Sequence, residues 1–382
     1  MQHASDKRAR QDVSSLNKQP RHAAVSARPY QGAYCRDRYG SGVLSDGRAR
    51  RAKRRVPLVL KVIASLFLVI VLGLCGYIFW FSSQLDRALS SDKDALEGVE
   101  DVLVPVDPSR PFYALLLGSD SREGGYSPNV TEQSGLERSD VIMLVRVDAP
   151  NRKLTMISIP RDTPYELEDG TIVKINEMYN RYGAAGSIKA VSEVTGAPIG
   201  HFAVVGFSDL ESIVDLLGGV EVDIDVELSY KDVHTLEQVT LQPGIQTING
   251  QQAQIFARAR HEYSDNQDMH RQNNVRTLLM AVLKKTLDRP ITEIPGIVLE
   301  EARHVTTSTR TGDLVSLALA FGSGQDLIVY SGTGPYDGDI VEYADGQWLC
   351  YRNPEGWARL MALVDAGEEP IGVDFAATQE LW

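Results

Sequence analysis

The sequence has few cysteines and none of the spacings that mark the common nucleophile, zinc or nucleotide enzymes. Three Cys in 382 residues cannot form a disulfide framework. No HExxH or CxxC spacing is present, so we expect His261, Glu262 and His270 to be surface residues. The segment Gly332–Gly334 lacks the lysine of a phosphate-binding loop and is predicted to be a loop. With 43% hydrophobic residues, the chain is too apolar for general disorder.

The charge is negative overall and unevenly distributed. The net value is -12, but residues 1–61 carry 15 Lys and Arg against four Asp. The rest of the chain is therefore strongly acidic. A negative mean argues against polyanionic partners only where the charge is evenly spread, so it excludes no phosphate-bearing substrate here.

One long hydrophobic run stands out, residues 62–81, which contain no charged side chain. Twenty helical residues span a hydrocarbon core about 30 Å thick. The basic stretch before the run predicts a cytoplasmic N-terminus and an extracytoplasmic remainder. A cleaved signal peptide is the alternative, but 61 residues precede the run and no A-x-A-like site follows it. The charge of the tail would also suit DNA, but a basic stretch next to a membrane anchor more often binds anionic lipid headgroups or sets the topology.

The domain organisation follows from this anchor. We expect a basic cytoplasmic tail over 1–61, a transmembrane helix over 62–81, a connector over 82–110 and an extracytoplasmic domain over 111–382. In that domain, apolar runs at 112–117, 140–147 and 153–159 predict strands. Alternating strand and helix patterns follow, with helices expected at 177–195, 250–260 and 274–288. The predicted fold class is α/β, a central mixed β-sheet flanked by helices in three α/β/α layers.

Paired arginines and carboxylates lie at the expected strand ends and turns. In open α/β sheets, ligands bind at the carboxyl ends of strands. Several Arg with two or more Asp suit a magnesium phosphate centre, because Arg forks bind phosphate oxygens and carboxylates bind Mg²⁺. A single Arg-x-Asp is more often a surface ion pair or a turn. The pairs are Asp120 with Arg122, Arg138 with Asp140, Arg161 with Asp162, Lys174 with Asn176, Arg258 with Arg260, and Asp268 with Arg271.

Taken in order, these motifs resemble the LytR-CpsA-Psr family of cell-wall enzymes. The resemblance covers about residues 112–287, and the basic tail and single anchor ahead of it are also typical of that family. It is carried by LLLGSDSR (residues 115–122), RSD (138–140), SIPRD (158–162), KIN (174–176), VDLLGGVEV (214–222), LQPG (241–244), INGQQA (248–253) and ARAR (257–260).

The resemblance implies an enzyme that transfers a glycopolymer from an undecaprenyl-pyrophosphate carrier to peptidoglycan, forming a phosphodiester outside the membrane. The implied cofactor is Mg²⁺, with Mn²⁺ as an alternative ion, bound by Asp120 and Asp140. A lipid tunnel walled by Val204, Phe207, Ile213 and Leu217 is also implied, and Asp162 or Asp268 is a candidate general base. The implied catalytic residues are Arg138, Arg161, Asp162, Arg258, Arg260 and Arg271, and the implied substrate-binding residues are Arg122, Lys174, Asn176 and Asp268.

One departure and two alternatives remain open. The family commonly shows Arg-x-x-Arg-Gln-Gln where this chain has Arg271-Gln-Asn-Asn-Val-Arg276, which puts the role of Arg271 in question. A pyrophosphatase would use the same site with water as acceptor. A membrane-anchored regulator would need a DNA-binding helix in the tail, whose lack of apolar periodicity argues against one. We therefore expect membrane lipids, the carrier-linked glycopolymer and peptidoglycan as partners, and no nucleic acid. Residues 299–382 are expected to complete the layers.

Overall fold

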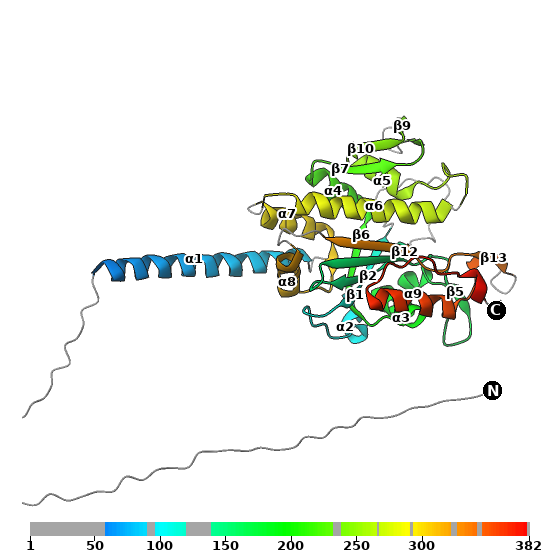
Figure 1. Cartoon of the computed structure of the whole chain (residues 1–382), viewed down its shortest axis with the longest axis horizontal. Helices are drawn as coiled ribbons and strands as arrows, with labels where there is room; N and C mark the ends of the chain where they lie inside the picture. The colour runs from blue at the N-terminus through cyan, green and yellow to red at the C-terminus, as the bar shows by residue number, and fades with distance from the viewer. Residues whose placement is uncertain are drawn as a thin grey trace, which may run out of the picture. The chain divides into compact units, whose positions relative to one another are not determined.

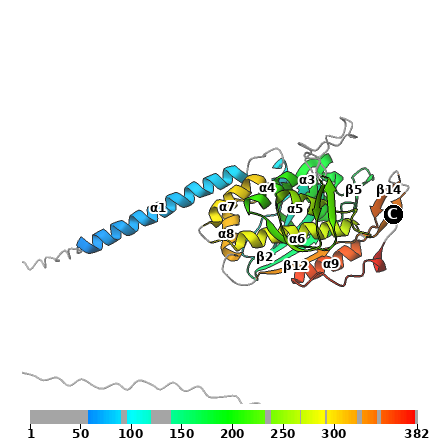
Figure 2. The same cartoon turned by 90° about the horizontal axis from the view of Figure 1, so that it is seen from above.

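The computed structural model describes residues 58–89, 96–119, 139–231, 238–265, 267–290, 293–321, 327–341 and 346–379 (Figures 1 and 2). Predictions about the tail before residue 58, and about Asp120, Arg122 and Arg138, lie outside these residues. Asp140 is placed by its backbone in a strand, and its side chain is also outside the description.

The main sheet has six strands in the order β11-β6-β1-β2-β3-β12. β6 runs parallel to β1 and β12 runs parallel to β3, while β2 is antiparallel to both of its neighbours. The carboxyl ends of β1, β3, β6 and β12 therefore share one edge with the start of β2. The bounds are β1 (Phe112–Ser119), β2 (Ser139–Asp148), β3 (Lys153–Ser158), β6 (Ile199–Gly206), β11 (Thr306–Thr307) and β12 (Ile328–Thr333).

Helices cover both faces of this sheet, as Figure 1 shows. Side chains alternate along a strand, so Ile142 and Leu144 of β2 enter one core while Val141 and Met143 enter the other. The first core contains residues of α2, α3 and α9, and the second contains residues of α4, α5 and α6. The predicted three-layer fold is confirmed. The helices are α2 (Val99–Val102), α3 (Glu177–Thr195), α4 (Phe207–Leu216), α5 (Gly250–Arg258), α6 (Gln267–Leu287), α7 (Ile294–Glu301) and α9 (Pro354–Ala366).

Short hairpins and turns complete the domain. The β4–β5 hairpin pairs Pro164 with Lys174 and thereby fixes the lysine beside the end of β3. The remaining elements are β4 (Pro164–Glu166), β5 (Ile172–Lys174), β7 (Val220–Ile224), β8 (Leu228–Lys231), β9 (Gln238–Leu241), β10 (Gly244–Ile248), β13 (Gly338–Val341), β14 (Gln347–Cys350), α8 (Thr311–Phe321) and the 3-10 turns η2 (Ala302–His304) and η4 (Ala376–Thr378).

Two local predictions are wrong. The helix expected over 274–288 begins seven residues earlier, at Gln267, because its first turns bury hydrogen-bonded polar side chains that show no apolar periodicity. The expected loop Gly332–Gly334 is partly the end of β12. Gly334 is required there by packing, since a Cβ would lie 2.0 Å from Cη2 of Trp357.

α1 (Leu58–Leu89) is a 32-residue helix, and its segment Ser65–Leu89 is long and apolar enough to cross a membrane. Its apolar side chains are widely exposed, including Phe67 and Phe79. The last turns differ, because Leu85 and Leu89 are buried in a small cluster with Ala302. The end of the apolar helix is therefore joined to the domain by packing.

Candidate active site

The candidate site lies where the parallel strands end. Ser119, the last residue of β1, pairs with Ser139 of β2 on one side and with Gly206 of β6 on the other. Asp140 follows Ser139 in β2, and Asp120 is the next residue in the chain after Ser119. The described register thus pairs Ser119 with Ser139, the neighbour of Asp140, while Asp120 lies outside the described residues.

The end of β3 presents Arg161 and Asp162. The carboxylate of Asp162 is bound by Nζ of Lys174 at 2.5 Å and lies 3.5 Å from Nε of Arg161. The backbone N–H of Asn176 donates to the carbonyl of Arg161 at 3.3 Å. The turn itself is fixed by Thr163, whose hydroxyl donates to the carbonyl of Pro160. The four predicted residues Arg161, Asp162, Lys174 and Asn176 are thus brought together.

A second group comes from the junction of α5 and α6, on the other side of this edge. Oδ1 of Asp268 lies 2.9 Å from Nη2 of Arg271, 3.4 Å from Nη2 of Arg260 and 3.9 Å from Nε of Arg161. Its other oxygen, Oδ2, accepts a hydrogen bond from the amide of Gln272 at 2.7 Å. One carboxylate therefore holds three guanidinium groups together, and through Arg161 it joins the two groups of residues.

Arg258 occupies a neighbouring position at the end of α5. Its guanidinium carbon lies 4.5 Å from the ring centroid of Phe207, the residue that follows β6. Because Gly206 pairs with Ser119, this contact places Arg258 by the ends of β1 and β6. An exposed cation–π contact stabilises modestly and orients the guanidinium.

The α6 segment that departs from the family pattern contains a residue that sequence reasoning missed. Nη1 of Arg276 donates to Oγ of Ser158 at 2.7 Å and to Oγ1 of Thr333 at 2.9 Å, which ties α6 to the ends of β3 and β12. Asn274 is buried and donates to the carbonyl of Phe256 in α5. The departure thus builds structural contacts. The sequence signal for Arg276 was its place at the end of the segment that departs from the family pattern.

The surroundings of Asp268, Cys350 and Arg276 change the pKa of each group. Burial opposes ionisation of Asp268, but the charge of Arg271, the bond from Gln272 and the other two arginines hold its pKa below the usual 3.8. Burial, followed by the charges of Asp162 and Asp268, raises the pKa of the Cys350 thiol. This thiol is therefore neutral, and it contacts the carbonyl of Tyr336. Burial lowers the pKa of Arg276 to about 10, so it stays charged at neutral pH.

Several buried polar atoms at this edge have no hydrogen-bond partner among the described residues. They are Oγ of Ser119 and Ser139, Oδ1 of Asn176 and Nη1 of Arg271. Buried polar groups are normally paired, so unpaired ones at one edge indicate a site for a polar ligand. The described residues contain no cluster of three His, Cys, Asp or Glu. The oxygen donors at this edge nevertheless fit Mg²⁺, which takes few protein carboxylates and the rest from phosphate and water.

One predicted wall residue of the lipid tunnel is placed wrongly. Phe207, Ile213 and Leu217 all lie in the second core, beneath α4 to α6. Val204 packs against the first core, on the opposite face of the sheet, because side chains alternate along β6. Val205 faces the second core in its place.

The geometry defines a class of protein: a three-layer α/β domain with an arginine-rich site at the carboxyl edge of its sheet. Residues 79–351 match the LytR_cpsA_psr family. The chain belongs to this family.

Characterised relatives agree with that assignment. The chain is 29% identical over 270 residues to the polyisoprenyl-teichoic acid--peptidoglycan teichoic acid transferase TagU of Bacillus mycoides, covering 70% of this chain and 81% of TagU. The crystal structure of B. subtilis TagV superposes with a TM-score of 0.57 at 21% identity, covering 68% of this chain and 97% of TagV. A structure of TagT bound to LIIa-WTA superposes with a TM-score of 0.53 at 21% identity, covering 69% of this chain and 94% of TagT. The predicted family and transferase class are both confirmed.

Proposed function

We propose that this protein is a Mg²⁺-dependent phosphotransferase that moves a glycopolymer from an undecaprenyl-pyrophosphate carrier to peptidoglycan. The observation that carries the proposal is the gathering of Arg161, Arg260 and Arg271 on the single carboxylate of Asp268. Three guanidinium groups and one carboxylate leave a positive surplus at the edge of the sheet. Planar guanidinium groups bind phosphate oxygens in pairs of hydrogen bonds, so a pyrophosphate is the ligand that suits this arrangement.

The name of the relative TagU states its donor as polyisoprenyl-linked and its acceptor as peptidoglycan, which supports the same two partners here. TagT, of the same fold, was solved with LIIa-WTA bound. The apolar side chains of Phe207, Ile213 and Leu217 lie on the α4–α6 side of the sheet, where a lipid tail of the donor would be accommodated.

The reaction needs positioning and charge neutralisation more than covalent chemistry from the protein. A sugar hydroxyl of peptidoglycan attacks the phosphorus joined to the polymer, the P–O bond to the second phosphate breaks, and undecaprenyl phosphate leaves. The hydroxyl proton passes to a base. The carboxylate of Asp268 is held by three guanidinium groups, which leaves Asp162 as our candidate base.

Asp120 and Asp140 would hold Mg²⁺, whose charge would neutralise the pyrophosphate oxygens when bound. Arg161, Arg258, Arg260 and Arg271 orient the same oxygens, with Lys174 and Asn176 supporting the Arg161–Asp162 turn. Arg122 and Arg138 are proposed for the same phosphate region on the resemblance alone.

The location that fits this reaction is the outer face of the cell membrane, with α1 as the anchor and the N-terminus in the cytoplasm. The basic residues before the apolar run support this orientation. The carrier lipid then lies in the same membrane as the anchor. A DNA-directed regulator is disfavoured, because the arginine cluster belongs to the domain that this orientation places outside.

Turnover of a lipid-pyrophosphate-linked oligosaccharide by the purified full chain tests the proposal. With Mg²⁺, we expect release of polyprenyl phosphate, and a loss of about 10²- to 10³-fold in kcat/KM for Arg161→Ala and Arg260→Ala, as for other preorganised charge-stabilising groups. Arg303→Ala is the matched control, since Arg303 is exposed and its guanidinium pairs with Glu300 of α7. Equal turnover in all four proteins would refute the site.

A further inference from the structure

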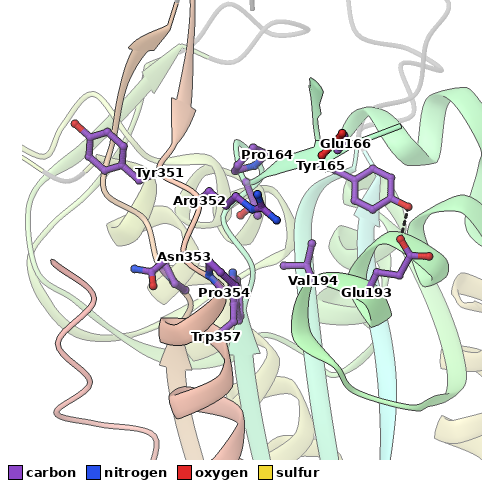
Figure 3. A pocket seen from close by; sticks show the side chains of 12 residues that line it. Pro164, Tyr165, Glu166, Glu193, Val194, Tyr351, Arg352, Asn353, Pro354 and Trp357 are labelled. Carbon is purple, nitrogen blue, oxygen red and sulfur yellow. Dashed lines mark hydrogen bonds between the residues drawn. The ribbon is translucent and has the colours of Figure 1, made fainter. Parts of the chain in front are cut away.

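A second hollow lies beside the candidate site, on the face of the sheet covered by α3 and α9. Figure 3 shows this pocket, which has a volume of about 240 Å³. Its walls come from β4, the end of α3, and the segment that leads from β14 into α9. The lining residues are Thr163, Pro164, Tyr165, Glu166, Glu193, Val194, Pro335, Tyr351, Arg352, Asn353, Pro354 and Trp357.

The pocket walls start at residues of the candidate site. Thr163 directly follows Asp162, and Pro164 pairs with Lys174 across the β4–β5 hairpin. The opposite wall starts at Cys350, whose backbone N–H donates to the carbonyl of Asp162 at 2.9 Å. The pocket therefore adjoins the turn that carries Asp162.

The pocket and the arginine cluster lie on opposite faces of the sheet. Tyr165 and Trp357 belong to the first core, whereas the α5–α6 elements that carry Arg260 and Asp268 pack on the second. A transfer between two large substrates needs both to reach one phosphorus atom. With the donor on the α5–α6 side, the α3–α9 side is left for the acceptor.

The chemistry of the lining suits a sugar. The hydroxyl of Tyr165 donates to Oε2 of Glu193 at 2.6 Å, and Figure 3 shows Arg352 extending into the space between Pro164 and Val194. A carboxylate and a guanidinium thus offer acceptors and donors to hydroxyl and amide groups. Ligand pockets combine such polar groups with apolar and aromatic walls. The volume is below the roughly 300–1,000 Å³ of pockets for drug-sized ligands, which suits one sugar ring.

We propose that this pocket binds one sugar unit of the acceptor glycan. This inference rests on the proposed function for the identity of the acceptor. Four of the twelve lining residues lie beyond the residues that match the family, which end at 351; they are Arg352, Asn353, Pro354 and Trp357. The pocket would select the acceptor independently of the pyrophosphate site.

Direct binding tests the pocket without relying on turnover. Isothermal titration of the full chain in detergent would use disaccharide fragments released from peptidoglycan. We expect saturable binding, weakened about tenfold or more by Arg352→Ala and by Glu193→Gln, since each removes hydrogen bonds to a charged group. Lys189→Ala is the control, because Lys189 is an exposed residue of α3 that pairs with Glu168 and does not line the pocket.

Each outcome decides the inference. Absence of binding by the wild-type chain, or unchanged binding by both variants, would overturn it. A parallel titration with the donor separates the two sources of sugar, because weaker donor binding with unchanged fragment binding would assign the pocket to the donor and refute the proposal. Binding that depends on Arg352 and Glu193, without any cleavage of the donor, would support the pocket and refute the proposed function.

Discussion

Asp268 is the residue on which the arrangement of the cationic site depends. Its carboxylate contacts Arg161, Arg260 and Arg271, which come from three different parts of the chain. From the sequence, Asp268 is expected to be a substrate-binding residue and a candidate general base, but no sequence pattern predicts that its carboxylate joins three arginines. In the structure this carboxylate orients the arginines that would bind the pyrophosphate.

Replacing this carboxylate tests that role. Asp268→Asn keeps the size of the side chain but removes the charge, so the three guanidinium groups repel one another without compensation. We expect kcat/KM for the carrier-linked donor to fall at least about tenfold, since charge-assisted hydrogen bonds are worth roughly 1.5–3 kcal/mol. Asp265→Asn is the matched control. Asp265 is an exposed carboxylate close in sequence to Asp268, and its Oδ1 makes a loose pair with Nε2 of His270 at 3.8 Å. Equal losses in both variants would contradict the role.

The same residue predicts a pH dependence of stability. The folded pKa of Asp268 is lowered below 3.8, so its contribution is fully present above the unfolded pKa and is lost as pH falls through the folded value. Wild type should therefore melt at a higher temperature than Asp268→Asn at pH 7. The difference in melting temperature should shrink as pH falls below about 4. A difference that stays constant down to pH 3 would show that the ion pairs do not stabilise the fold.

At the scale of elements, the sheet register does most of the assembly. The strands and the helix α3 could be predicted, because their apolar periodicity and Gly stops are strong local signals. The start of α6 could not, since Arg271, Gln272 and Asn274 are buried by hydrogen bonding and not by hydrophobicity. Arg260 and Arg161 meet at Asp268 because of tertiary packing, which no local sequence pattern predicts.

α5 offers a test of how an element positions a site residue. Its start is fixed by a capping box, in which Oδ1 of Asn249 accepts from the N–H of Gln252 at 3.0 Å and the Gln252 side chain accepts from the N–H of Asn249. Its end carries Arg258. We expect Asn249→Ala to lower the free energy of unfolding by about 1 kcal/mol in urea titrations. Asn249→Asp should lower it by less, because Asp also caps a helix N-terminus. No change in Asn249→Ala would show that α5 is held by packing alone.

At the scale of the whole molecule, the fold combines an apolar helix with a two-sided domain. The last turns of α1 bury Leu85 and Leu89 against Ala302, the first residue of η2 between α7 and α8. Cationic residues gather toward the α5–α6 face, and the pocket opens on the α3–α9 face. The negative total charge describes neither of these sites, which is why composition alone says little about the substrate.

The most direct test of the account follows the phosphorus next to the sugar. The full chain in lipid vesicles would be given Mg²⁺, peptidoglycan and a polyprenyl-pyrophosphate-linked oligosaccharide labelled at that phosphorus. The account predicts that the label becomes covalently attached to peptidoglycan as a phosphodiester while unlabelled polyprenyl phosphate is released. Recovery of the label only as free phosphorylated oligosaccharide, with no label on peptidoglycan, would contradict it and identify a hydrolase.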